Sequence, residues 1–353
     1  MRAFTYAGAP TRVVFGTGAV GSLSAEIDRL GAKRVLALAT PGRGASVRAS
    51  VASLGERLAG IYDKALMHVP VEVAADARRV AQDMHADCCI AWGGGSTIGL
   101  GKAIALTTGL PVIAVPTTYS GSEMTAVVGM TDRGEKKTQR DSRMLPRTVI
   151  YDPELTLALP AATSAASGMN AIAHSVEALY AHDANPVSVM LAEEGIRVLA
   201  AALPRVVAAP SDLAARSEAL LGAWLCGAAF ATTSLGLHHK LCHVLGGTFN
   251  LPHAETHSIV LPHAIRYNHD AAPDAMRRIA RGLGTDDAAT GIYDLEKKLG
   301  LRMKLADIGM PADGLARAAK MATDSPYPNP RPPAYDAVLA LLHDAHQGRR
   351  PSA

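Results

Sequence analysis

The stretch CCIAWGGGSTIGLGKAIALT at residues 88–107 decides the fold class. Its first five residues are apolar on both faces, which is typical of a strand buried inside a sheet. Three glycines and Ser96 follow, and residues 97–107 predict a helix. Glycines leave backbone N–H groups bare and a helix N-terminus carries partial positive charge, so a phosphate can bind against both. The stretch therefore predicts a strand, a phosphate-binding loop at residues 93–96 and a helix.

The same alternation continues on both sides of this stretch. Further strands are predicted at residues 12–15, 34–39 and 112–115, and further helices at residues 20–30 and 45–58. Short apolar strands separated by helices indicate a parallel sheet covered on both faces. The last of these strands runs into the hydroxyl-rich loop PTTYSGS at residues 116–122. Ligands bind at the carboxyl edge of such sheets, so we expect this loop and residues 93–96 to share a diphosphate site.

The pattern changes after residue 153, where long helical stretches rich in alanine and leucine begin. Helices are predicted at residues 170–180, 186–202, 212–231 and 334–346, and a proline-rich segment at residues 325–333 predicts an extended loop. We therefore expect an α/β domain at residues 1–155 and an all-helical domain at residues 156–353.

Composition and charge exclude several classes of protein. Of 353 residues, 48% are hydrophobic and 19% are charged, and the net charge is +3. This balance is globular, and the charge is too small to indicate a nucleic-acid groove or an anionic membrane partner. Residues 219–237 lack charged side chains but contain glycines and hydroxyls, so we expect a buried helix and not a membrane span. Four cysteines do not form a disulfide framework, which favours a reduced, cytoplasmic protein.

A second glycine-rich stretch, GTGAVG at residues 16–21, matches the dinucleotide fingerprint by letter. The fingerprint also requires an acidic residue at the end of the second strand, where this chain has TPGR at residues 40–43. An ordinary strand-to-helix turn is therefore the favoured interpretation, and pyrophosphate binding there is the alternative.

Histidines gather in the second half of the chain. Seven of the 13 fall between His238 and His269. His239 and His243 are four residues apart and share a helix face, which we expect to end at Gly246 and Gly247. His238, His257, His263 and His269 are interpreted as supporting or surface residues, and Cys242 as a small core residue facing away from His239.

Three of these imidazoles suggest the remains of a metal centre. His174, His239 and His253 could close around an ion, with Asn170, one helical turn before His174, as a fourth ligand. A neutral amide compensates a divalent cation less than a carboxylate does, which weakens the metal hypothesis.

Together these motifs resemble the iron-containing alcohol dehydrogenases, which share the dehydroquinate-synthase-like fold. The matching stretches, in order, are GGGS at 93–96, PTT at 116–118, YDPEL at 151–155, GMNAIAH at 168–174 and His239-x3-His243-x9-His253. Within that family the sequence looks most like the maleylacetate reductases, on three features. Position 170 is Asn where metal-dependent members carry Asp, residues 116–125 read PTTYSGSEMT, and residues 326–331 read PYPNPR.

The resemblance assigns roles to individual residues. It implies that the pyrophosphate of NADH or NADPH lies on Gly94, Gly95 and Ser96, the adenine-ribose side near Thr40 and Pro41, and the nicotinamide near Thr117, Thr118 and Ser122. It makes Asn170, His174, His239 and His253 former ligand positions without a metal. His243 becomes the catalytic residue, assisted by His239 and His253, and residues 16–21 are not the phosphate loop.

The implied reaction reduces the C=C bond of maleylacetate to give 3-oxoadipate in microbial degradation of aromatic compounds. Hydride addition beta to the ketone leaves an enolate, which needs hydrogen-bond donors and a proton. The two substrate carboxylates need cationic or hydroxyl partners, and the candidates are Tyr119, Ser120, Lys240, Tyr327 and Arg331. Because Thr40 is neutral and Arg43 is close, NADPH should be accepted alongside NADH. A homodimer is expected.

Three rival functions remain open. The first is a metal-dependent alcohol dehydrogenase that uses iron or zinc on a small alcohol or aldehyde. The second is a dehydroquinate-synthase-like lyase, which would need more basic residues and a full metal site. The third is a binding module without chemistry, which a failure to bind NADH would indicate.

Overall fold

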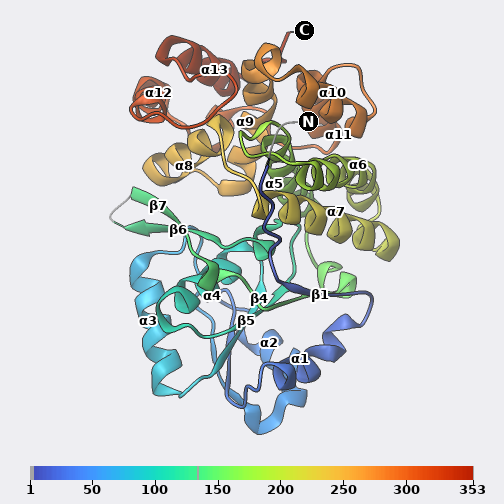
Figure 1. The fold of residues 1–353 in the computed structure, drawn as a ribbon, viewed down its shortest axis with the longest axis vertical. Helices are drawn as coiled ribbons and strands as arrows, with labels where there is room; N and C mark the ends of the chain where they lie inside the picture. The colour runs from blue at the N-terminus through green and yellow to red at the C-terminus, as the bar shows by residue number, and fades with distance from the viewer. Residues whose placement is uncertain (1–3, 133–134, 353) are drawn as a thin grey trace. The chain divides into compact units, whose positions relative to one another are not determined.

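The computed structural model describes residues 4–132 and 135–352, which form two compact units (Figure 1). One unit is residues 9–159. The other begins at Pro160 and also includes the segment that precedes Ala9. The division after Leu159 lies a few residues beyond the predicted position 155. The predicted architecture, an α/β region with a parallel sheet followed by a helical region, is confirmed.

The first unit is built on a parallel sheet of six strands. In spatial order they are β1 (Arg12–Phe15), β8 (Thr148–Tyr151), β5 (Val112–Pro116), β4 (Cys88–Gly93), β2 (Val35–Leu38) and β3 (Leu58–Tyr62). Every neighbouring pair is parallel. The central strands β2, β4 and β5 are buried along almost their whole length, which explains why they are apolar on both faces.

Helices cover both faces of this sheet. On one face, α1 (Leu23–Arg29) and α2 (Gly44–Ser50) join the core formed by Cys88, Ile90 and Trp92. On the other face, α4 (Gly95–Thr108) approaches closely at Gly101, where a Cβ atom would lie 3.3 Å from Ala91 Cβ. Helix α3 (Val71–Asp83) packs beside α4.

Several local predictions for this unit were wrong or incomplete. The helix predicted at residues 45–58 ends at Ser50, and a 3₁₀ segment with Gly55 at a left-handed φ of 54° leads into β3. The helix predicted at residues 20–30 is a 3₁₀ turn, Ala19–Ser22, followed by α1. Strands β3 and β8 and the antiparallel hairpin of β6 (Val127–Asp132) and β7 (Glu135–Arg140) were missed. All are short or partly exposed, so they lack a long apolar run.

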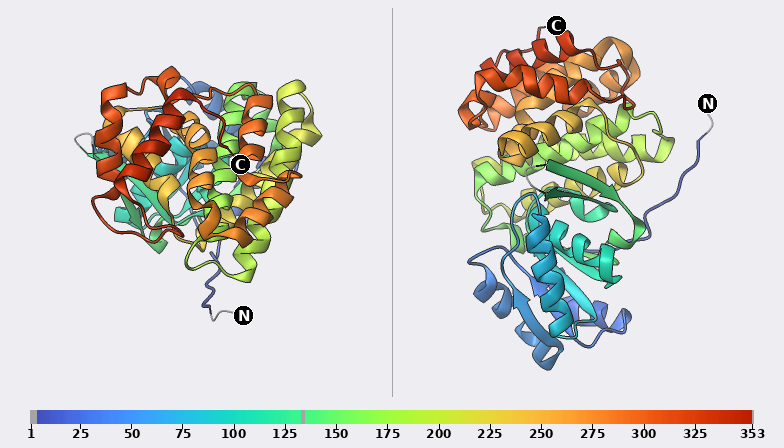
Figure 2. Two further views of the ribbon diagram at one scale, coloured as in Figure 1. Left: turned by 90° about the horizontal axis from the view of Figure 1, so that it is seen from above. Right: turned by 90° about the vertical axis from the view of Figure 1, so that its left-hand side faces the viewer.

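The second unit is helical from α5 to α13. Its helices are α5 (Ala161–Tyr180), α6 (Pro186–Ala208), α7 (Leu213–Ala231), α8 (Leu237–Phe249), α9 (His253–Asn268), α10 (Pro273–Leu283), α11 (Ala288–Lys298), α12 (Leu315–Thr323) and α13 (Tyr335–Gln347). Helices α12 and α13, red in Figure 2, pack against each other. Over the described residues, none of the helices combines the length and the apolarity needed to cross a membrane.

Close contacts between α5, α6 and α7 depend on glycine. A Cβ atom on Gly168 would lie 2.5 Å from Leu203, and one on Gly222 would lie 2.7 Å from Leu199. These small residues let the long helices pack tightly and fix the position of α5, which carries Asn170 and His174.

The prediction that Gly246 and Gly247 end their helix was wrong. Helix α8 continues through both and ends at Asn250, which has a left-handed φ of 53°. Each glycine inside a helix costs about 1 kcal/mol relative to alanine. Buried Val244 and Leu245 on the same helix, and Leu251 just after it, pack into the core, which offsets that cost.

Candidate functional site

The glycine loop and the threonine loop of the α/β unit lie together at the carboxyl edge of the sheet. Gly93 pairs with Pro116 in the register of β4 and β5, and the Thr117 N–H donates to the Gly93 carbonyl at 3.1 Å. A Cβ atom on Gly94 would lie 2.9 Å from the Thr118 methyl group, so only glycine fits there. The expected adjacency of the two loops is therefore observed.

Helix α4 begins within this glycine loop. The N–H groups of Thr97 and Ile98 donate to the Gly94 carbonyl at 3.1 Å, which leaves those of Gly95 and Ser96 for a ligand, and Gly95 is exposed. Thr40 follows β2, the neighbour of β4 in the sheet, and is half-buried, whereas Pro41 is exposed. Bare donors, partial positive charge and an open surface suit a diphosphate. The dinucleotide roles of these residues stay a prediction.

The rival glycine stretch at residues 16–21 is already occupied by a carboxylate of the same unit. The N–H groups of Gly18 and Val20 donate to the two oxygens of Asp152, at 3.2 and 3.1 Å. Asp152 also accepts from the N–H of Glu154. Because this anion fills the donors that a phosphate would need, the loop is a structural turn.

Sequence reasoning missed a buried lysine beneath the threonine loop. Lys102 on α4 is fully buried, and its ammonium donates to the carbonyls of Ser122 and Val127 and to the hydroxyl of Thr125, at 2.6 to 2.9 Å. Burial lowers the pKa of Lys102 to about 7, against the opposing charge of Glu123. These bonds tie the loop that carries Ser122 to α4. The available signal was a single lysine in an otherwise apolar helix.

The histidines of the helical unit gather around a second missed residue, Glu177. This carboxylate is buried on α5 and accepts the N–H groups of Gly236 and His238 at 2.9 and 2.8 Å. It also accepts Nδ1–H of His239 at 2.8 Å. Burial raises the pKa of Glu177, and the hydrogen bonds oppose that shift. The signal in the sequence was its spacing of three residues from His174 on the same helix.

Glu177 and a residue of the proline-rich loop, Asn329, both bind the start of α8. Asn329 accepts the Leu237 N–H at 3.1 Å and donates to Asn268 at 2.7 Å. Two side chains remote in sequence thus bind the N–H groups at the start of α8, whose own N-cap residue, Gly236, has no side chain. This arrangement fixes where His238 and His239 lie.

The predicted catalytic and former ligand residues lie in one cluster. The ring of His174 stacks on Phe230 and on His239, with centroids 4.4 and 5.0 Å away. His243 meets His239 edge to face at 6.1 Å, and His253 begins α9. His243 and His253 are only partly buried.

Four of the five predicted substrate-binding residues remain candidates. Lys240 and Tyr327 are partly buried, and Arg331 is exposed with its guanidinium 4.5 Å from the centre of the Tyr267 ring. Ser120 is buried and 3.5 Å from Glu123. The position of Tyr119 does not favour its predicted role, because its ring is fully buried and its hydroxyl donates to Thr156.

The former ligand positions fit a divalent ion poorly. Asn170 brings a neutral oxygen, which is buried and has no hydrogen-bond partner among the described residues. Throughout residues 4–132 and 135–352, the one group of three histidine, cysteine or acidic side chains whose ligand atoms lie within 4.8 Å of one another is a different one, His238, Cys242 and His257. Three imidazoles and an amide bring no negative charge, so they leave the charge of a divalent ion uncompensated.

Comparisons with known proteins identify the family of this chain. A family model described as iron-containing alcohol dehydrogenase matches residues 10–153, and the model for the C-terminal region of the same family matches residues 164–346. The chain is 56% identical to maleylacetate reductase of Burkholderia cepacia over 100% of both chains. It is 50% identical to that of Sphingobium indicum over 99% of both. The crystal structure of maleylacetate reductase from Agrobacterium tumefaciens has a TM-score of 0.94 and 48% identity, covering 99% of this chain and 100% of that one.

Proposed function

Because this chain belongs to the iron-containing alcohol dehydrogenase family, and is thus an oxidoreductase, we propose that it reduces the C=C bond of maleylacetate to give 3-oxoadipate, with NADH or NADPH as hydride donor. The observation that carries the proposal is the neutral Asn170 in a buried histidine cluster. The resemblance of the sequence to the maleylacetate reductases, and the relatives of that name at 50 and 56% identity, support it.

The chemistry asks for hydrogen-bond donors and a proton. Hydride addition beta to the ketone places negative charge on the enolate oxygen, and the adjacent carbon must then be protonated. His243 supplies the proton in this proposal, and His239 and His253 line the same cluster. Glu177 positions His239 through Nδ1, which directs Nε2 of that ring away from the carboxylate. The proposal assigns no step to a metal, because Asn170 and the three imidazoles bring no negative charge to a divalent ion.

The first experiment follows the loss of NADH absorbance with maleylacetate, using enzyme pretreated with a chelator. Rapid oxidation supports the proposal. Oxidation that returns only after iron or zinc is restored would overturn its metal-independent part and favour the alcohol dehydrogenase alternative. His243→Ala should lower kcat by about 10²-fold or more if this imidazole is the proton donor. His269→Ala, which removes an exposed imidazole paired with Asp270, is the matched control.

Three finer properties belong to the same proposal. NADPH is accepted alongside NADH, because Thr40 carries no charge and Arg43 is exposed nearby; comparison of kcat/KM for the two cofactors tests this. The protein is cytoplasmic, which its four buried cysteine thiols support. It forms a homodimer, and light scattering after size-exclusion chromatography gives the mass that decides it.

A further inference from the structure

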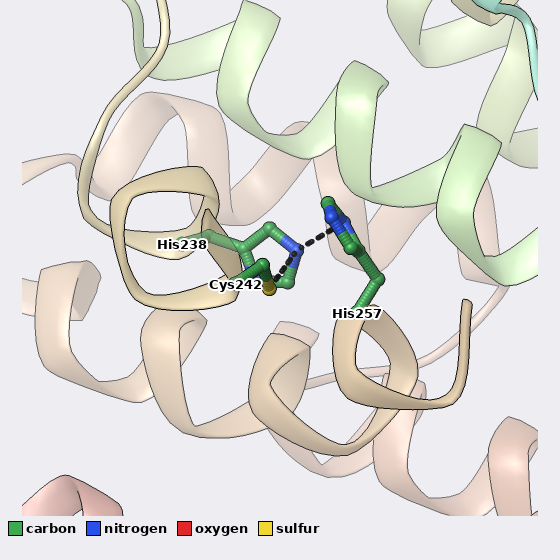
Figure 3. A group of neighbouring side chains, drawn as sticks. All are labelled: His238, Cys242 and His257. Carbon is green, nitrogen blue, oxygen red and sulfur yellow. Dashed lines mark hydrogen bonds between the residues drawn. The ribbon is translucent and has the colours of Figure 1, made fainter. Parts of the chain in front are cut away.

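The buried group formed by His238, Cys242 and His257 is distinct from the former ligand positions. His238 and Cys242 are four residues apart on α8, so they share a face, and His257 faces them from α9 (Figure 3). The three side chains are at most 1% exposed. Sequence reasoning treated the two histidines as supporting or surface residues and Cys242 as a core residue, whereas all three are buried in the structure.

We propose that these three residues form a metal site that takes one divalent ion of the zinc type through two imidazole nitrogens and one thiolate. His238 Nε2 lies 3.1 Å from His257 Nδ1 and 3.7 Å from Cys242 Sγ. Zinc–nitrogen bonds of about 2.0–2.1 Å and a zinc–sulfur bond of about 2.3 Å place such ligand atoms roughly 3.4 and 3.6 Å apart in a tetrahedral centre. The observed separations differ from these by a few tenths of an ångström.

The proton balance of binding is simple. Without an ion, the close nitrogens of His238 and His257 share one hydrogen bond. Their outer nitrogens, Nδ1 of His238 and Nε2 of His257, are buried with no hydrogen-bond partner among the described residues. Without an ion, one ring therefore carries its single proton on a close nitrogen; when the ion binds, that proton moves to the outer nitrogen of the same ring, so both rings stay neutral. The ion then displaces one proton, that of the Cys242 thiol, because a metal binds the thiolate.

The charge balance favours this group over the former ligand positions. A divalent ion with one thiolate keeps a single positive charge, which in a buried site requires an anion nearby. Glu177 provides it, because its carboxylate accepts the His238 N–H at 2.8 Å and interacts electrostatically with that residue. The ion, the thiolate and the carboxylate sum to zero. At the former ligand positions Asn170 contributes no charge, so the same ion would keep a positive charge there.

The chemistry of the donors also selects the ion. Thiolate and imidazole suit zinc and cobalt, whereas magnesium and calcium require oxygen ligands. Around Cys242, the side chains of Leu241 and Leu245 are apolar, and the Thr256 carbonyl, 3.9 Å from Sγ, is a single oxygen where magnesium or calcium would need six or more. Since the group is sealed, the ion must enter while the chain folds.

The test replaces zinc by cobalt during expression and records the absorption spectrum of the purified full-length protein. We expect about one cobalt per chain and a thiolate-to-cobalt charge-transfer band in the near ultraviolet. Cys242→Ser should remove the band. Cys226→Ser, which changes another fully buried thiol, on α7, is the matched control and should keep it. His174→Ala should also keep it, because His174 belongs to the former ligand positions only.

A measurement on the unchanged protein covers the case in which Cys242→Ser does not fold. X-ray absorption at the metal edge should show one sulfur neighbour at about 2.3 Å together with nitrogen neighbours. A protein that folds with no bound metal, or a bound metal with only nitrogen and oxygen neighbours, would overturn the proposal. So would a charge-transfer band that survives Cys242→Ser. None of these readouts depends on turnover, so they are independent of the proposed reductase activity.

Discussion

Glu177→Ala tests whether one carboxylate holds the histidine cluster together. The substitution removes the acceptor of three hydrogen bonds of 2.8 to 2.9 Å, from the backbone of Gly236 and His238 and from the ring of His239. All three donors would be left buried without an acceptor, because Gly236, His238 and His239 are all buried. Losing these hydrogen bonds therefore destabilises both the start of α8 and the histidine cluster.

The expected size of the effect follows from these bonds. A buried donor that loses its partner costs about 1–3 kcal/mol. Three such donors set the upper limit of the loss in the free energy of unfolding. Removing Glu177 also removes the cost of burying its charge, which makes the net loss smaller. A net loss of about 3 kcal/mol is therefore expected. For a unit of this size, it corresponds to a fall in Tm of roughly 6–12 °C.

The assay is thermal unfolding followed by circular dichroism, with Glu177→Gln measured beside the alanine variant. Glutamine keeps an acceptor oxygen for the His238 N–H, but its amide donor then faces both Nδ1 of His239 and the Gly236 N–H, which share the other carboxylate oxygen. It should recover part of the stability while lowering kcat, because His239 must adopt the other tautomer. A Tm for Glu177→Ala within about 2 °C of the wild type would refute the reasoning, since the bonds would then contribute less than about 1 kcal/mol.

Three further predictions concern the α/β unit. Lys102 favours its neutral form when folded, because burial lowers its pKa from 10.5 to about 7, so the unfolded chain binds more protons above pH 7. Stability should therefore rise by about 1–2 kcal/mol between pH 7 and 9 relative to Lys102→Met, measured by urea unfolding; parallel curves would contradict this. Gly94→Ala should weaken NADH binding about 10-fold or more, because its Cβ would lie 2.9 Å from Thr118. Gly21→Ala, where a Cβ meets nothing within 4 Å, is the control, and equal dissociation constants for the two variants would refute the steric argument. Asp152→Ala should lower stability by about 2–3 kcal/mol by leaving the Gly18 and Val20 N–H groups unpaired, yet leave the dissociation constant of NADH unchanged in a fluorescence titration.

The sequence predicted the parts of the fold that have strong local patterns. The central strands β2, β4 and β5 were found because both of their faces are buried, so apolar residues run without interruption. The glycine loop at residues 93–96 was found because a strand and a helix bound it directly. Strand β3 was missed because Gly60 and its half-buried neighbours give no such run, and because the preceding helix ends early, before Gly55.

The site was predicted less completely, because its organisation depends on contacts between remote residues. The spacing of His239, His243 and His253 revealed the cluster, since four residues bring two side chains to one helix face. Nothing local indicated that Glu177 and Asn329 would bind the start of α8, because these partners are 59 and 92 residues from the N–H groups they accept. Tyr119 shows the same limit: its place in a loop of hydroxyls suggested a substrate ligand, and nothing local indicated its hydrogen bond to Thr156, 37 residues away.

The charges of the helical unit connect these observations. A carboxylate buried among histidines is costly unless hydrogen bonds or a cation compensate it. In this chain Glu177 receives backbone and imidazole donors, and burial still raises its pKa, so the compensation is incomplete. An Asp at position 170 would add a second negative charge to the same helix and would require an ion between them. With Asn170, Glu177 is the acid of this group, and the ring that donates to it is that of His239, one of the former ligand positions, at 2.8 Å. If the proposed site at His238, Cys242 and His257 takes an ion, the same carboxylate would balance the charge that the thiolate leaves.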